Sequence, residues 1–145
     1  MKYIFTIALC FSITFGCAQI DTLQQKMLPM SATIEKPYKV GSVYYKKGTK
    51  TPYTGVLYGK FDNGKYLTLQ EYKGGIGNGT YINYYENGNP KEVGTYIDNR
   101  VEGPVKLYHS NGKIKASGTF KHWKRRTGLW TFYDENGKQV KTISY

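Results

Sequence analysis

Cysteine is nearly absent from this chain of 145 residues, and both copies lie close to its start. Cys10 belongs to an expected leader segment, so the mature chain keeps at most Cys17 and has no internal disulfide. A secreted domain without disulfides must be held together by burial of its apolar side chains. The aromatic residues described below are therefore expected to form the core.

Histidine is also scarce, and no catalytic motif is present. His109 and His122 do not stand at metal-ligand spacing from each other or from a cysteine. The sequence contains no Gly-x-Ser-x-Gly, no glycine-rich phosphate loop with lysine and no His-Glu-x-x-His. Asp62, Glu86 and Asp134 lie beside Asn-Gly pairs, where acidic residues are expected for solubility rather than for acid–base catalysis. We therefore expect no enzymatic activity, no cofactor and no metal site.

Acidic residues are few relative to basic ones. The chain has 10 Asp and Glu against 21 Lys and Arg, which gives a formal net charge of +11. Such a balance favours anionic partners such as phospholipid, acidic polysaccharide or an acidic protein. Nucleic acid is a weaker candidate for an exported chain. The alternative is a lysine-rich surface that prevents edge strands from pairing with other chains.

A long hydrophobic run occurs only at the start. Residues 1–18 have a basic residue, Lys2, followed by an apolar run, which is the pattern of a signal peptide rather than of a membrane span. Thr14-Phe15-Gly16-Cys17 resembles a bacterial lipobox, so Cys17 is a candidate for lipidation. Simple cleavage before Gln19 is the alternative. We expect an exported protein, either a lipoprotein of the bacterial outer membrane and periplasm or a secreted one.

Tyrosine and glycine are abundant. There are 15 Tyr and 17 Gly, and 16% of the residues are aromatic. This composition favours strands and tight turns over helices. A disordered glycine-rich chain would contain few aromatic residues.

A ten-residue pattern occurs four times. It runs from an opening glycine at 55, 79, 103 and 128 to the glycine of an Asn-Gly pair at 64, 88, 112 and 137. Both series step by 24, 24 and 25 residues, and a fixed period of this size indicates an array of like units.

Each unit is predicted to be a β-hairpin. The Asn-Gly pair is expected to form a two-residue turn with positive φ at both positions. Gly94 and Gly118 interrupt the second strand, which predicts that an aromatic ring from the next strand lies across them. The fold class is all-β, an elongated single-sheet antiparallel meander of about four hairpins.

The chain divides into three segments. The leader at 1–18 is followed by an aperiodic tether at 19–41, broken by Pro29 and Pro37, with room for one short strand. The repeat domain occupies 42–145, and its first strand, near 42–48, is expected to cap the array. In the last three units the second and fifth residues after the opening glycine are apolar, which requires either a bulge or aromatic rings on both faces.

The repeated residues resemble the bacterial variant of the MORN repeat. The matching positions are Gly79, Tyr84, Gly88, Gly103, Tyr108, Gly112, Gly128, Trp130, Tyr133 and Gly137. The first unit departs from the pattern at Lys60 and Gln70. The resemblance implies a scaffold that holds a partner or sits at a membrane, and proteins with this array are often labelled YwqK-type antitoxins.

The connection at residues 121–127 is the longest and carries the extra residue of the third step. Its candidate site residues for an anion or a partner are Lys121, Trp123, Lys124, Arg125 and Arg126. Interleaved cations and an aromatic ring suit anionic headgroups, acidic sugars or phosphates. The alternative is a hydrophilic loop whose tryptophan folds back on the sheet. The sequence thus predicts a non-catalytic binding or scaffolding module of the cell envelope, with an antitoxin or immunity protein as the alternative.

Overall fold

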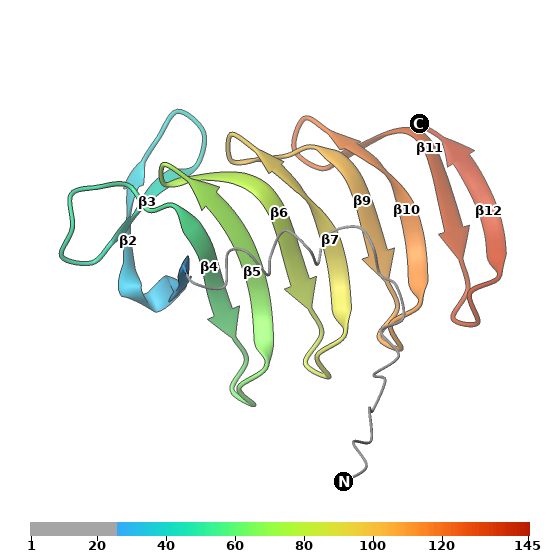
Figure 1. The fold of residues 1–145 in the computed structure, drawn as a ribbon. Helices are drawn as coiled ribbons and strands as arrows, with labels where there is room; N and C mark the ends of the chain where they lie inside the picture. Colours follow the sequence, from blue (N-terminus) through green and yellow to red (C-terminus); the bar gives the residue numbers. More distant parts are fainter. Residues whose placement is uncertain (1–25) are drawn as a thin grey trace, which may run out of the picture.

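The computed structural model describes residues 26–145, which form an almost entirely β protein (Figure 1). The described residues contain no α-helix, only a short 3₁₀ turn, η2, at Met30–Ala32. The strands are β1 (Met27–Pro29), β2 (Thr33–Pro37), β3 (Ser42–Lys46), β4 (Gly55–Lys60), β5 (Tyr66–Lys73), β6 (Ile76–Tyr84), β7 (Pro90–Ile97), β8 (Arg100–Val101), β9 (Gly103–Tyr108), β10 (Ile114–Lys121), β11 (Arg125–Tyr133) and β12 (Gln139–Ser144).

The main sheet follows the chain order. From β4 to β12 each strand pairs antiparallel with the next, and the short β8 pairs with β7 beside this path. Figure 1 shows the strands side by side in one curved layer, with the four Asn-Gly turns along the same edge. The predicted meander of hairpins is confirmed. None of the helices described is long and apolar enough to cross a membrane.

The Asn-Gly pairs form turns, but not of the predicted type. Only the glycines have positive φ, at 81°, 92°, 85° and 85° for Gly64, Gly88, Gly112 and Gly137. In the second turn, Gly88 N–H donates to the Tyr85 carbonyl and Tyr85 N–H donates to the Asn89 carbonyl, both at 2.9 Å. Three residues therefore link the strands, and such a loop needs a single left-handed residue. The prediction of a two-residue turn with positive φ at Asn is wrong.

Left-handed pairs occur instead at the opposite edge. The connections between units carry positive φ at Gly74 and Gly75 and at Asp98 and Asn99. There the strands are joined by two residues, as a turn of that type requires.

The asparagines of the Asn-Gly turns join each unit to the next. The Nδ2 groups of Asn63, Asn87 and Asn111 donate to the carbonyls of Glu86, Ser110 and Glu135 at 3.0, 2.7 and 2.8 Å. Two positions before Asn87, Tyr85 Oη donates to the Tyr108 carbonyl at 2.8 Å. His109 is half-buried, and its Nε2 lies 3.0 Å from the Tyr133 carbonyl. It therefore takes the bridging place of Tyr85 in the next unit.

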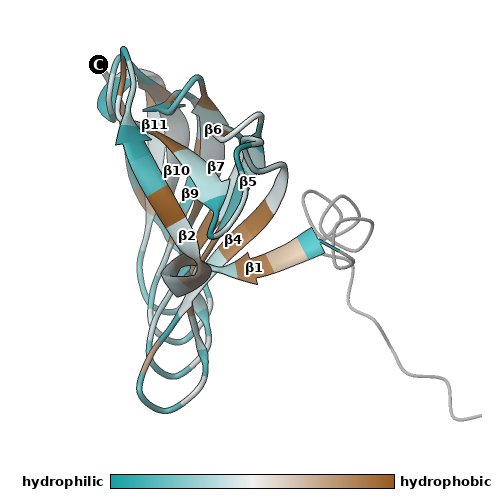
Figure 2. Cartoon of the chain, turned by 90° about the vertical axis from the view of Figure 1, so that its left-hand side faces the viewer, coloured by the Kyte–Doolittle hydropathy of each residue, from teal (hydrophilic) through white to brown (hydrophobic). Residues whose placement is uncertain are grey.

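The segment expected as a tether is folded over the part that the structure describes. β1 pairs in parallel with β4, through Met27 with Val56 and Leu28 with Leu57. Figure 2 shows the hydrophobic residues of β1 and β4 close together at this end of the sheet. β2 pairs with β3 in a second, two-stranded sheet. The sequence signal is weak here because β1 has only three residues and includes a proline.

The cap and the array are joined by hydrogen bonds. Tyr44 N–H donates to the Gly75 carbonyl at 2.8 Å, which ties β3 to the turn between β5 and β6. Asn99 Nδ2 donates to the carbonyls of Val40 and Ser42 at 2.7 and 3.0 Å. The cap is therefore fixed to the turns along the edge opposite the Asn-Gly turns.

The core lies on one face of the sheet. Tyr81, Val105 and Trp130, which occupy the same position in successive units, are each at most 3% exposed. A Cβ on Gly118 would lie 2.3 Å from Cδ2 of Trp130, and one on Gly94 would lie 2.7 Å from Oη of Tyr81. Rings therefore lie across both glycines. The ring comes from the following strand at Gly118, as predicted, but from the preceding strand at Gly94, where the predicted strand is wrong.

Aromatic rings also occupy the other face. Tyr84, three residues after Tyr81 in β6, points away from the core because side chains alternate along a strand. Its ring centroid lies 6.4 Å from that of Tyr66, which lies 5.6 Å from that of Tyr58. A register shift also falls at Tyr84 in the pairing of β6 with β7. Both explanations that the sequence left open, a bulge and rings on both faces, therefore apply.

Candidate anion-binding turn

The basic connection is a tight turn between β10 and β11. Lys121 pairs with Arg125, so only three residues turn the chain. These are His122, Trp123 and Lys124, with φ of 45°, 65° and 63°. The left-handed conformation costs about 1–2 kcal/mol for each residue that is not glycine. Three such residues in a row are a strained feature that other contacts must stabilise.

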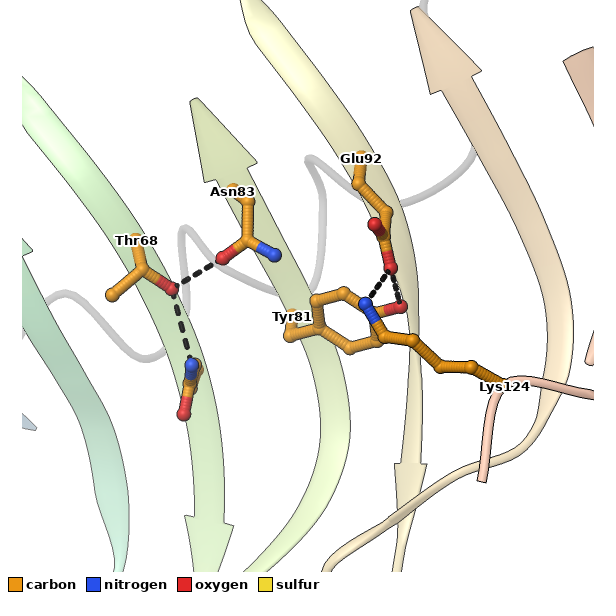
Figure 3. Close-up of polar contacts among 6 residues, drawn as sticks. Thr68, Tyr81, Asn83, Glu92 and Lys124 are labelled. Carbon is orange, nitrogen blue, oxygen red and sulfur yellow. Dashed lines mark hydrogen bonds and ion pairs between the residues drawn. The ribbon is translucent and has the colours of Figure 1, made fainter. Parts of the chain in front are cut away.

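Lys124 supplies the main stabilising contact. Its side chain turns back over the core face, and its Nζ lies 2.7 Å from Oε1 of Glu92 in β7 (Figure 3). The same carboxylate oxygen accepts the hydroxyl proton of Tyr81, and Nζ of Lys124 lies 5.8 Å from the centre of that ring. The Glu92 side chain is 16% exposed, so its ion pair with Lys124 is only partly screened by water.

The hydroxyl of Tyr81 remains protonated in this contact. Burial, and then the neighbouring Glu92 carboxylate, raise the pKa of Tyr81 above its ordinary value. The phenol can therefore donate to the carboxylate throughout the neutral range. Glu92 thus binds two donors, one from the core and one from the turn.

The same face carries a polar row towards the N-terminal end. Thr68 Oγ1 donates to Oδ1 of Asn83 at 2.9 Å, and Asn83 is the register partner of Glu92 (Figure 3). Further along, Leu107 and Ala116 continue this row across the sheet. Across the sheet this row is polar before Glu92 and apolar after it, and Glu92 is its one carboxylate. Glu92 also lies within reach of the basic turn.

Arg126 is also engaged inside the molecule. Its guanidinium lies 4.7 Å from the ring centre of Trp130 and 5.4 Å from those of Phe132 and Tyr145. Nη1 donates to Oη of Tyr145 at 2.8 Å. Arg126 therefore covers the C-terminal end of the aromatic core.

Three of the five predicted site residues remain directed to the surface. Trp123 is 58% exposed, and Lys121 and Arg125 are exposed at the base of the turn. Within residues 26–145 neither cation forms an ion pair, whereas Nδ1 of His122 lies 3.8 Å from Glu102. Lys124 and Arg126 therefore have contacts within the molecule, whereas Lys121, Trp123 and Arg125 extend into solvent. The predicted lipidation site Cys17 and the leader at 1–18 lie outside the described residues.

Sequence reasoning missed Glu92. The signal for it was present, because the equivalent positions of the other units hold Thr68, Ala116 and Lys141. A carboxylate that replaces neutral or basic residues in a repeat is unusual, and the inserted basic connection could have suggested its partner. The distance of 32 residues between Glu92 and Lys124 hid that relation.

No group of three or more His, Cys, Asp or Glu in the described chain could hold a metal ion. A shallow, open depression of about 400 Å³ lies between the first two Asn-Gly turns, lined by Lys60, Phe61, Asp62, Asn63 and Glu86. The carboxylate of Asp134 accepts the backbone N–H groups of Asn136 and Lys138, both at 2.9 Å, and so stabilises its own turn.

Comparison with known proteins supports the repeat assignment. The family model for the MORN repeat variant matches residues 78–98, 101–122 and 126–145. These segments carry the second, third and fourth units, and the first unit lies outside them. These three units are therefore similar to the MORN repeat variant, and repeats of that kind are generally binding or scaffolding modules.

Two solved structures show a weak likeness. They are a mutant of S. aureus TarM in complex with fondaparinux, alpha-GlcNAc-glycerol and UDP, at 13% identity and a TM-score of 0.39, and TarM, at 15% and 0.38. The alignments cover 88% and 87% of this chain, and the chain spans only 22% and 21% of the two structures. At these TM-scores the likeness says nothing about function. No curated protein matches the chain.

Proposed function

We propose that this chain is a non-catalytic binding or scaffolding module of the bacterial cell envelope, exported and anchored by a lipid on Cys17. The turn between β10 and β11 binds an anionic surface. The sheet positions this turn and supplies a rigid body for a protein partner.

The observation that carries the proposal is the conformation of the turn itself. Three consecutive left-handed residues persist, and the contact of Lys124 with Glu92 and Tyr81 stabilises them. The consequence is a fixed turn with Trp123 outermost, flanked by Lys121 and Arg125. An indole ring beside two cations suits the boundary of an anionic bilayer, where the ring enters the headgroup region and the cations meet phosphate.

The charge of the whole molecule supports the same partner chemistry. A net charge of +11 attracts anionic surfaces and speeds association with them. The charge alone is not selective, because lysines are spread over many strands. The turn adds the aromatic ring and a fixed geometry.

Sedimentation with vesicles tests the proposal. Wild-type protein is expected to bind vesicles that contain anionic phospholipid more tightly than neutral vesicles, and to be released by added salt. Replacing both Lys121 and Arg125 by serine is expected to weaken binding about thirtyfold, since each cation near the surface is worth about 1 kcal/mol. The matched control replaces Lys106 and Lys115, two exposed lysines on strands, and removes the same charge.

Equal loss of binding in the control would mean that net charge alone attracts the protein, and the turn would have no special role. A parallel experiment with an acidic polysaccharide in place of vesicles distinguishes lipid from sugar as the anionic ligand. Tighter binding to the polysaccharide than to anionic vesicles would identify an acidic sugar as the ligand.

The anchor is tested separately. The segment from Thr14 to Cys17 supports lipidation, and Cys17→Ser is expected to move the protein from the membrane fraction to the soluble fraction of the envelope. If the Cys17→Ser variant stays in the membrane fraction and still needs detergent for its release, the proposed lipid anchor is contradicted. Pull-down from envelope extracts then identifies protein partners.

The antitoxin alternative rests on the family resemblance. It requires a neighbouring toxin-like reading frame and growth arrest on deletion of this gene, relieved when that frame is also removed. An enzymatic role would require turnover by the purified protein that is lost when one carboxylate or histidine is replaced.

A further inference from the structure

The two ends of the array differ in how their edge strands are covered. At the N-terminal end the edge strand is β1, which has only three residues and pairs in parallel with β4. At the other end β12 pairs with β11 only, and most of its side chains are exposed. Within the described chain, β12 therefore presents an unpaired edge.

The backbone groups of this edge can be assigned from the register. Tyr145 and Gly128 exchange N–H···O=C bonds of 3.0 and 3.2 Å, so the backbone of Tyr145 faces β11. Because alternate residues of an antiparallel pair bond to the same neighbour, Ile143 and Lys141 also face β11. The N–H and C=O groups of Thr142 and Ser144 then point outward and are open to a further strand.

An edge of this kind accepts a strand elsewhere in the same sheet. The strands equivalent to β12 in the other three units are β5, β7 and β10, and each pairs antiparallel with the first strand of the following unit. Ser117 of β10, which is equivalent to Thr142, pairs with Thr131 of β11. The twist and spacing required for an added strand are thus already present.

The chemistry beside the edge favours an acidic strand. β12 contains no acidic residue, and Nζ of Lys141 lies 5.3 Å from the ring centre of Phe132 on the core face. The guanidinium of Arg126 lies on the same aromatic surface, over Trp130 and Tyr145. Acidic side chains at alternate positions of an added strand would all point to this face, where the two cations lie.

We propose that β12 binds an extended acidic segment of a partner protein by strand addition. The incoming strand pairs antiparallel with Thr142 and Ser144, and its alternating carboxylates contact Lys141 and Arg126. Main-chain hydrogen bonds provide affinity, and the charges select the sequence. A second copy of this chain is a poor occupant, because each copy carries a net charge of +11.

Fluorescence anisotropy with a labelled peptide tests this proposal. The probe alternates Glu and Val over about eight residues, slightly longer than β12. A second peptide keeps the same Glu residues but has Pro in place of Val, which preserves the charge and prevents strand pairing. Binding is expected for the first peptide and a loss of at least about tenfold for the second, because several backbone hydrogen bonds are removed.

Protein variants locate the site. Thr142→Pro removes an outward N–H without removing a bond to β11, and is expected to weaken binding about tenfold. Lys141→Ser is expected to weaken it about threefold, and Lys106→Ser, on β9, is the control that leaves it unchanged. Circular dichroism verifies that each variant is folded. If Thr142→Pro does not fold, the two peptides still decide whether strand pairing occurs.

Three results would overturn the proposal. The proline peptide binding as tightly as the first would show attraction by charge alone. Unchanged binding by folded Thr142→Pro would place the peptide elsewhere. Dimerisation of the protein without peptide, measured by light scattering and abolished by Thr142→Pro, would show that a second copy covers the edge. The double serine variant of Lys121 and Arg125 should bind the peptide normally, which separates this site from the basic turn.

Discussion

At the scale of single residues, the tightest requirement is the approach of an aromatic ring to a glycine backbone. Trp130 is fully buried and lies directly over Gly118. Its indole is wedged between rings of Phe120 and Phe132, with centroids at 5.2 and 6.2 Å. A ring held on both sides cannot move aside for an added methyl group.

Gly118→Ala is therefore expected to destabilise the protein by about 2 kcal/mol, within the range known for overpacked cores. Urea denaturation measures the change. Gly59→Ala is the matched control, because a Cβ there would lie 3.4 Å from Cγ2 of Thr68, at the near limit of ordinary contact. A loss for Gly118→Ala no greater than for Gly59→Ala would mean that the ring can shift.

The buried tyrosines predict a pH dependence. Burial raises the pKa of Tyr72 and Tyr81 above the ordinary value of 10.0. The folded state then holds these protons more tightly than the unfolded state, so their contribution is complete below pH 10.0 and decreases as the pH rises above it. Each tyrosine should add about 1.4 kcal/mol per pH unit to the slope of the unfolding free energy.

Denaturation curves recorded from neutral to strongly alkaline pH test this dependence. Tyr81→Phe should reduce the alkaline slope relative to that of the wild-type protein. An unchanged slope in Tyr81→Phe would contradict the assignment of a buried phenol bonded to Glu92.

At the scale of elements, the asparagine side chains act as connectors between hairpins. Asn87 bonds both to its own turn, through the N–H of Asn89 at 2.9 Å, and to the next turn, through the Ser110 carbonyl at 2.7 Å. The fourth turn has the same Asn-Gly pair, but Asn136 has no following turn within the described residues.

Asn87→Ala should therefore cost about 1–2 kcal/mol, and Asn136→Ala clearly less. Hydrogen exchange should show faster opening of both turns joined by Asn87. Equal losses for the two substitutions would indicate that the asparagines serve only their own turns.

The basic turn predicts a separation of stability from binding. Asparagine tolerates the left-handed conformation better than tryptophan, so Trp123→Asn should stabilise the fold by up to about 1 kcal/mol. Trp123→Ala removes the ring but keeps most of the strain, and should leave stability nearly unchanged. Thermal unfolding and vesicle sedimentation measure the two properties, and both variants should bind anionic vesicles more weakly than wild type. If Trp123→Asn binds anionic vesicles as tightly as wild type, the indole ring takes no part in the proposed contact.

The features that the sequence predicted are those fixed by local backbone requirements. Turn glycines and Gly118 recur because no other residue fits their φ or the space beneath a ring, and this recurrence is visible in one sequence. The type of the Asn-Gly turn was missed because Asn87 is selected by a carbonyl in the next unit rather than by its own φ. The contact of Lys124 with Glu92 was missed because it depends on two positions 32 residues apart.

At the scale of the whole molecule, the two proposed binding surfaces lie at the C-terminal end of the sheet. β12 is the last strand of the described sheet, and the basic turn projects from the edge opposite the Asn-Gly turns. The envelope module that we propose would therefore contact an anionic surface and a partner strand at the same time. The excess of positive charge serves both contacts, which should weaken together as salt is added.

The most direct test of the basic turn is tryptophan fluorescence with vesicles. The chain has two tryptophans, and Trp130 is fully buried while Trp123 is 58% exposed. Anionic vesicles should shift the emission to shorter wavelength and protect it from a soluble quencher, and Trp123→Phe should abolish both effects. Neutral vesicles should cause no change. An emission that stays constant while the protein binds anionic vesicles would contradict the account, since Trp123 would then lie outside the contact.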